Sequence, residues 1–141
     1  MMQVVPFKSE HFWAIDVQPA QEYVKTYVRT DYLKALEYQY SFSILVGDLV
    51  VACMGCIELF ANRGAMWAYI SRFAGPHFHA VHSLAQRIIE DVPYQRLESE
   101  VDYDFEQGHR WMKLLGFVCE AERMKHAAAN GGDCALYAKV K

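Results

Sequence analysis

One carboxylate interrupts an otherwise apolar run in the first half of the chain. Glu58 is the only charged residue of Leu49–Leu59. Burial of a carboxylate on such a strand raises its pKa toward the range in which it takes a proton from another group. Glu58 is therefore a candidate general base.

The same run contains Cys53 and Cys56, which have the C-x-x-C spacing of redox and zinc sites. On a strand, positions three apart point to opposite faces, so the two sulfurs converge only at a bulge. The chain has no second C-x-x-C to complete a tetrahedral zinc site. We expect buried thiols here rather than metal or redox chemistry, and such thiols are typical of a reducing cytoplasm.

The histidines His77, His79 and His82 form a further candidate group. Their spacing brings no carboxylate partner and no third ligand that reliably converges with the others. We predict no metal site, and the local sequence indicates no Ser-His-Asp or catalytic-cysteine arrangement.

Composition limits the classes of function. The chain has 141 residues, 53% hydrophobic and 22% charged, which suits one ordinary core, so we predict a single domain over residues 1–141. Its 14 lysines and arginines are scattered and its net charge is −3, which argues against nucleic-acid binding and favours a cationic substrate such as an amine. We expect neither a signal peptide nor a membrane span, because the N-terminus lacks the features of the first and no apolar run is long enough for the second.

Hydrophobic periodicity predicts the elements that position these residues, since alternation indicates strands and three- and four-residue spacing indicates helices. In the first half we expect a strand at Gln3–Phe7, a helix capped by Ser9, a helix over Gln21–Tyr38 that restarts near Thr30, and strands at Tyr40–Val46, Leu49–Leu59 and Met66–Ser71. In the second half we expect a helix that includes Phe78–Ile89 and stops before Pro93, a strand at Arg96–Tyr103, a helix at Phe105–Leu115 closed by Gly116, and strands at Phe117–His126 and Ala135–Val140.

Two groups of side chains on these strands each have two interpretations. Glu98, Glu100 and Asp102 share one face of their strand, where they either attract an ammonium substrate or form a solvated charged row. Trp67 and Tyr69 either line an acceptor groove or belong to the core.

This order of elements, together with the segments Arg96–Asp102 and His109–Phe117, resembles the GNAT superfamily of N-acetyltransferases. The ending Trp111–Phe117 looks like the helix closure of that family and is most similar to short GNAT-like proteins of tailed bacteriophages, some of them virion-associated. The likeness in fold covers most of the chain. It implies an α/β fold of the α+β type, a GNAT-like mixed, mostly antiparallel sheet of roughly seven strands with about four helices on its two faces.

In that family the loop that opens the helix after the fourth strand holds the pyrophosphate of acetyl-CoA on backbone N–H groups. Here the equivalent loop keeps Arg72 and Gly75 but not the full Arg/Gln-x-x-Gly-x-Gly/Ala pattern, and the bulky Phe73 and Phe78 would crowd a phosphate. The resemblance implies acetyl-CoA as the cosubstrate. It assigns cofactor binding to Ile70, Arg72, Ala74, Gly75, His77 and Phe78.

The resemblance also places the family's general-acid Tyr at Met112 and a frequent Asn at Phe105, and neither of these side chains donates a proton. Tyr103 and His109, near the expected place of the CoA sulfur, are the substitutes, with Glu58 as the base. The alternatives are that His109 is a polar residue on a helix surface and that Tyr103 is half-buried packing.

Two functions follow from the resemblance. One is transfer of an acetyl group from acetyl-CoA to the primary amine of a small molecule or peptide by direct attack. The other is a non-catalytic GNAT-like phage protein with a structural or partner-binding role, as a homodimer or with a virion partner. We expect the protein in the host cytoplasm or in the virion, with neither a nucleic-acid nor a membrane partner.

Overall fold

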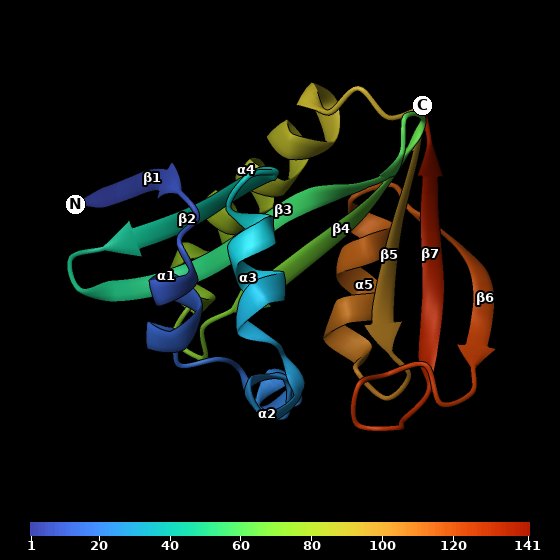
Figure 1. The fold of residues 1–141 in the computed structure, drawn as a ribbon, viewed down its shortest axis with the longest axis horizontal. Helices are drawn as coiled ribbons and strands as arrows, with labels where there is room; N and C mark the ends of the chain where they lie inside the picture. Colours follow the sequence, from blue (N-terminus) through green and yellow to red (C-terminus); the bar gives the residue numbers. More distant parts are fainter. The chain divides into compact units, whose positions relative to one another are not determined.

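The computed structural model describes residues 1–141, and its strands form one sheet in the order β1-β2-β3-β4-β5-β7-β6 (Figure 1). The strands are β1 Met2–Pro6, β2 Tyr40–Val46, β3 Leu49–Phe60, β4 Arg63–Ile70, β5 Arg96–Asp102, β6 Val118–Met124 and β7 Cys134–Val140. The helices are α1 Ser9–Ala14, α2 Val24–Tyr27, α3 Thr30–Leu36, α4 Phe78–Asp91 and α5 Glu106–Leu114, with short 3-10 helices η1 Pro19–Gln21 and η2 Gly75–His77.

The strands pair in both directions. The pairs β1–β2, β2–β3, β5–β7 and β6–β7 are antiparallel. β4 and β5 are parallel, with Arg63 opposite Arg96 and Ala65 opposite Glu98. The predicted fold class, a mixed and mostly antiparallel sheet of seven strands, is confirmed.

The N-terminal helices are shorter than predicted. The helix expected over Gln21–Tyr38 is interrupted, because Val28 and Arg29 both adopt an extended backbone with ψ 142°. The predicted restart at Thr30 is confirmed as the first residue of α3. Ser9 begins α1 but does not cap it, since its backbone N–H donates to the carboxylate of Glu37 at 2.8 Å and Lys8 is the N-cap.

Residue contacts divide the chain into two compact units. The N-terminal unit comprises Met1–Ile57 and Trp67–Val92, and the C-terminal unit comprises Glu58–Met66 and Pro93–Lys141. The predicted cofactor residues therefore belong to the N-terminal unit and the predicted catalytic residues to the C-terminal unit.

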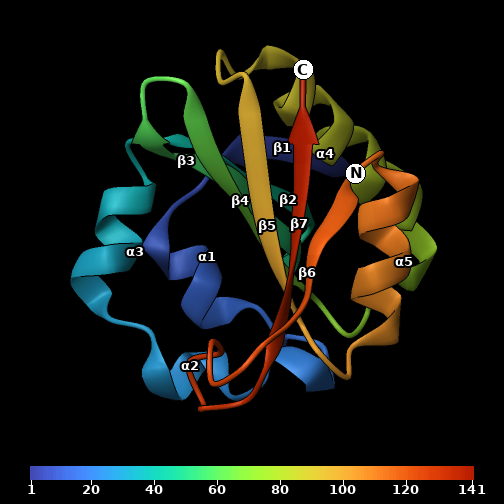
Figure 2. The same cartoon turned by 90° about the vertical axis from the view of Figure 1, so that its right-hand side faces the viewer.

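Helices cover both faces of β2 and β3 in the N-terminal unit (Figure 2). On one face, α1 and α3 form a core in which Phe12, Leu33 and Cys53 are each fully buried. On the other face, α4 buries Val81, Leu84, Ala85, Ile88 and Ile89. Because both faces are covered, β3 is buried from Val50 through Cys56, as predicted for a central strand.

One helix covers one face of the strands in the C-terminal unit (Figure 2). α5 approaches β5 so closely that a Cβ on Gly108 would lie 2.7 Å from Cγ1 of Val101. Gly116 follows the helix with φ 88°, in the left-handed region that favours glycine. The predicted closure of this helix by Gly116 is confirmed.

Candidate functional site

The loop after β4 leads directly into the longest helix of the chain. It folds on its own backbone: the N–H of Phe73 donates to Oγ of Ser71 at 3.0 Å, and the N–H of His77 donates to the carbonyl of Ala74 at 2.8 Å. η2 then continues into α4, with Pro76 in its first turn. The start of α4 carries the partial positive charge of a helix N-terminus, which suits an anion.

The space beside Gly75 is open. A Cβ built on this residue would meet no atom within 4 Å. Phe73 and Phe78, which the sequence places as obstacles to a phosphate, are instead 55% and 38% exposed. Their rings therefore reach solvent and do not fill the space next to Gly75.

Arg72 already has partners inside the chain. Its Nε donates to Asp16 at 2.9 Å, and its Nη2 donates to Glu22 at 2.6 Å. The hydrogen bond to Glu22, together with the charge of Asp16, raises the pKa of Arg72. A phosphate that binds this guanidinium must compete with two carboxylates.

Ile70 and Ala74 are buried, with 8% and 3% of their surface exposed. The N–H of Ile70 donates to the side-chain oxygen of Gln21 at 2.9 Å, and its carbonyl accepts from the N–H of Gln18 at 2.8 Å. The predicted cofactor residues thus fall into two groups. The helix start and Gly75 fit an anion as they stand, whereas Ile70 and Arg72 fit a ligand only after they exchange partners.

Glu58 is exposed, so the predicted burial of this carboxylate is wrong. The buried part of β3 ends at Cys56. Glu58 lies beyond it, among the exposed residues at the end of the strand. The side chain of Glu58 reaches solvent. Its role as a general base stays a prediction.

His109 uses both of its ring nitrogens within the C-terminal unit. Nε2 lies 2.8 Å from the carbonyl of Tyr103, so it donates, and Nδ1 shares a hydrogen bond with the hydroxyl of Tyr137 at 2.8 Å. The ring links the start of α5 to Tyr103, directly after β5, and to β7. These two hydrogen bonds give His109 a structural role. Proton transfer by His109 would first require that one of them break.

Tyr103 follows β5 directly and is 39% exposed. The guanidinium of Arg123 lies over its ring, 4.3 Å from the centroid. Asp133 holds this arginine through a 2.6 Å ion pair and accepts the N–H of Tyr103 at its own carbonyl. Tyr103 is therefore a half-exposed ring that stacks on a fixed cation.

The two positions where the family has polar residues are packing positions here. Met112 is 7% exposed within α5. Phe105 is the N-cap of α5, and its ring would lie 2.7 Å from a Cβ on Gly108. Neither residue supplies a proton, in agreement with the expectation from sequence.

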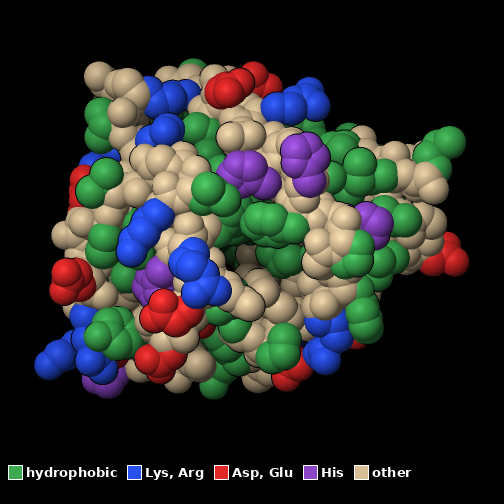
Figure 3. Space-filling view, turned by 180° about the vertical axis from the view of Figure 1, so that it is seen from behind, with side chains coloured by type: hydrophobic (Ala, Val, Ile, Leu, Met, Phe, Trp, Pro, Cys, Tyr) green, Lys and Arg blue, Asp and Glu red, His purple; other side chains and the backbone are tan.

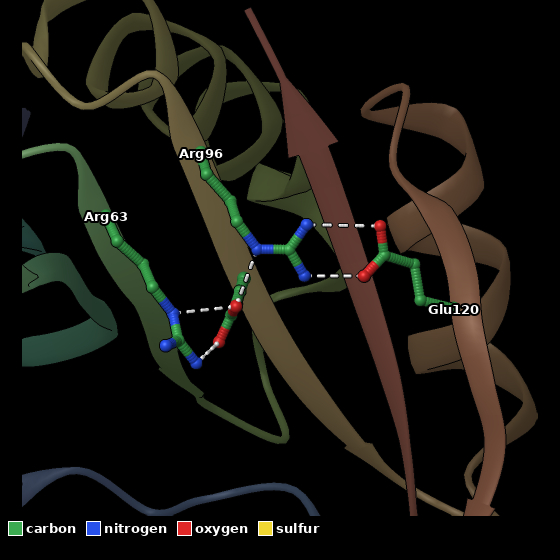
Figure 4. A network of polar contacts seen from close by, with 4 residues as sticks. Arg63, Arg96 and Glu120 are labelled. Atoms are coloured by element: carbon green, nitrogen blue, oxygen red, sulfur yellow. Dashed lines mark hydrogen bonds and ion pairs between the residues drawn. The ribbon is translucent and has the colours of Figure 1, made fainter.

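A network of four charged residues crosses β4, β5 and β6 of the C-terminal unit (Figure 4). Glu98 accepts from Nε and Nη2 of Arg63 at 2.8 and 2.9 Å, and from Nε of Arg96 at 2.7 Å. Arg96 then forms a two-pronged pair with Glu120. The two hydrogen bonds from Arg63, followed by the one from Arg96, lower the pKa of Glu98.

The acidic row of β5 is therefore not uniform. Glu98 is 8% exposed and neutralised by two arginines, whereas Glu100 is exposed. Partial desolvation, with the negative charges of Glu98 and Asp102, raises the pKa of Glu100. Both sequence interpretations treated the row as one unit, and they missed the network because Arg63 is distant in sequence.

The remaining candidates have structural explanations. Trp67 and Tyr69 pack against the N-terminal core, where Phe7 meets Trp67 edge to face with centroids 5.1 Å apart. Cys53 and Cys56 are buried without a disulfide, and desolvation raises the pKa of Cys53 to about 12. A thiol with so high a pKa is a poor nucleophile.

The charged surface is mixed in sign. On the face seen in Figure 3, lysine and arginine side chains are interspersed with acidic and apolar ones rather than gathered in one patch. None of the helices has the length and apolar character needed to cross a membrane.

Comparisons with known proteins bear on the fold. No family model matches the chain, and no curated protein matches its sequence. Among solved structures it is similar to Ard1 from Thermoplasma volcanium, with a TM-score of 0.77 and 12% identity over 99% of this chain and 97% of that one. It is also similar to a GNAT-family acetyltransferase from Bacillus anthracis, with a TM-score of 0.69 and 14% identity over 99% and 94% of the two chains.

A third similar structure is the ribosomal-protein-S5-alanine acetyltransferase from Vibrio fischeri, with a TM-score of 0.68 and 17% identity over 99% and 92% of the two chains. The fold is that of the GNAT acetyltransferases. At these identities the likeness establishes the architecture and not the chemistry.

Proposed function

We propose that this protein is a GNAT-type N-acyltransferase that moves an acetyl group from acetyl-CoA to the primary amine of a small molecule or peptide. The observation that supports the proposal is the loop after β4. In a fold shared with acetyltransferases, it presents the N-terminus of α4 beside open space at Gly75. An anionic group is stabilised there by the helix dipole and by backbone N–H groups.

The chain's own residues divide the work as follows. Gly75, His77 and the start of α4 bind the phosphates, and bound acetyl-CoA would supply an acyl group activated as a thioester. The exposed Glu58 takes the proton from the attacking amine. Because Met112 donates no proton, positioning of the amine carries most of the rate.

Thermal unfolding with excess acetyl-CoA tests cofactor binding. Micromolar binding at millimolar ligand stabilises the folded state by about 4 kcal/mol. Gly75→Asp adds a negative charge at the start of α4 and is expected to abolish that stabilisation. Gln86→Glu adds the same charge on the exposed face of the same helix and is expected to preserve it. A melting temperature of the wild-type chain that acetyl-CoA leaves unchanged would contradict the proposal.

Turnover tests the base. Glu58→Gln is expected to lose acetyl transfer to amines and to bind acetyl-CoA as the wild type does. Equal turnover in the two proteins removes Glu58 from the mechanism and leaves cofactor binding as a separate result.

A second candidate function is a non-catalytic GNAT-like phage protein with a structural or partner-binding role, in a homodimer or a virion. The internal partners of Arg72 and Ile70 and the buried Met112 favour it. Absence of binding to both acetyl-CoA and CoA, with a folded chain, is the result that this function predicts.

A further inference from the structure

Near its end, β4 faces β3 along one edge and has a second edge on the opposite side. The N–H of Ser71 donates to the carbonyl of Val51 in β3 at 2.9 Å. Along an extended strand, successive residues direct their backbone groups to alternate edges. Ala68, Ile70 and Arg72 therefore present their N–H and C=O groups on the edge opposite β3.

The segment Asp16–Glu22 occupies this edge. Val17 pairs with Ser71 as an antiparallel bridge. The N–H of Gln18 donates to the carbonyl of Ile70 at 2.8 Å, and the N–H of Arg72 donates to the carbonyl of Asp16 at 2.9 Å. The backbone of the segment thus acts as a short additional strand.

The side chain of Gln21 extends this pairing where the backbone does not. Its Nε2 donates to the carbonyl of Ala68 at 2.7 Å, and its Oε1 accepts from the N–H of Ile70 at 2.9 Å. The carboxamide of Gln21 offers the same N–H donor and C=O acceptor as a backbone peptide group. Another molecule with an amide that donates and accepts in the same way fits the same two backbone groups.

Exposed ion pairs hold the two ends of the segment. Arg72 pairs with Asp16 and Glu22, and the side chains are 37%, 55% and 58% exposed. Ion pairs at such exposure are individually weak and are replaced by water at little cost. Val17 is the only buried side chain of the segment, with 4% of its surface exposed, so Gln21 and the ion pairs can release β4 while Val17 stays in the core.

We infer that the Asp16–Glu22 segment is an intramolecular occupant of the ligand site on β4, and that an amide-bearing acyl carrier binds only after Gln21 releases Ala68 and Ile70. The inference rests on the proposed function, because Ile70 and Arg72 are two of the residues that it assigns to cofactor binding. Opening of the exposed ion pairs of Arg72 with Asp16 and Glu22, in the same segment, makes its guanidinium available to an anion. Intramolecular occupancy reduces the apparent affinity by the fraction of molecules in the released state.

Gln21→Ala tests the inference because it removes both side-chain bonds to β4. In the protein without ligand, the Ile70 amide is expected to exchange with solvent faster, as followed by ¹⁵N-resolved hydrogen exchange. In calorimetric titrations, acetyl-CoA is expected to bind this variant roughly tenfold more tightly than the wild type, since two competing hydrogen bonds are gone. Gln21→Met removes the same bonds and keeps the side-chain length if the alanine variant is poorly folded. Gln86→Ala, on the exposed face of α4, is the matched control and is expected to leave both quantities unchanged.

The outcomes separate the two proposals. If wild type and both Gln21 variants bind acetyl-CoA equally, and the Ile70 amide resonance of the wild type does not move on binding, the segment is no occupant and the inference fails alone. If no variant binds acetyl-CoA, the proposed function fails and the inference falls with it. Tighter binding by the Gln21 variants only, with a shifted Ile70 amide in the liganded wild type, supports both.

Discussion

The molecule contains two arginine–carboxylate clusters that differ in the exposure of their carboxylates. In the N-terminal unit, exposed Arg72 lies between the exposed carboxylates of Asp16 and Glu22. In the C-terminal unit, the side chain of Glu98 is only 10% exposed and lies between Arg63 and Arg96. Water can replace the partners of an exposed charge but not those of a buried one. The first cluster is therefore suited to open, and the second to hold β4, β5 and β6 in place.

Removal of the buried charge has the largest expected effect. Glu98→Gln keeps the shape of the side chain but leaves Arg63 without its carboxylate and Arg96 with Glu120 alone, and we expect the free energy of unfolding to fall by about 2 kcal/mol. Urea denaturation at neutral pH measures it. Glu100→Gln, on the same face of β5, is the control. A loss no larger than that of the control contradicts the difference between the two clusters.

Low pH should remove the contribution of Glu98 to the free energy of unfolding. Because its pKa is lowered in the folded state, its stabilisation is present above the ordinary pKa of 4.5 and is lost as pH falls through the folded value. The difference in unfolding free energy between wild type and Glu98→Gln should therefore be full at neutral pH and shrink below pH 4.5. A difference that stays constant into acid would mean that packing, rather than charge, makes Glu98 important.

Glu100 should show the opposite sign at a smaller size. Its pKa is raised in the folded state, so the charged form costs stability above that value. We expect Glu100→Gln to raise the melting temperature slightly at neutral pH, and the gain to disappear as pH falls through the folded pKa toward 4.5. A melting temperature that drops at neutral pH would show that the carboxylate makes a favourable contact.

The Arg72 cluster should affect global stability least. We expect Arg72→Gln to unfold at nearly the same urea concentration as wild type, while the amides of Ile70 and Gln18 exchange several-fold faster because the segment opens more often. About 1 M salt, with a Debye length of about 3 Å, should accelerate the same amides in the wild type. Loss of global stability comparable to that of Glu98→Gln would remove the contrast between the clusters.

Local patterns were sufficient to predict most of the fold. β2 begins and ends at the predicted residues, Tyr40 and Val46, because strict alternation has only one strand interpretation. Gly116 was identified as a helix closure because the left-handed conformation leaves a local signature. β4 begins earlier than predicted, at Arg63, since the turn before it lies at Ala61 and Asn62.

The site was predicted less well because its decisive contacts are long-range. Alternation placed Glu98 on the correct strand face, but its partner Arg63 is 35 positions away. Gln21 and Ile70 are 49 positions apart, and a glutamine at the end of a short 3-10 helix has no local feature that reveals such a contact. Glu58 was expected to be buried because it lies within an apolar run, whereas the buried part of β3 ends at Cys56.

Gln21 also has a consequence for ligand discrimination. A molecule that arrives at β4 gains only the difference between its own bonds to Ala68 and Ile70 and the bonds that Gln21 already makes there. A compound that offers only a donor or only an acceptor replaces two hydrogen bonds with one and is rejected. A chain with a correctly spaced amide exchanges them evenly, and its remaining contacts decide the affinity. Gln21 would in this way favour ligands whose amide both donates to Ala68 and accepts from Ile70.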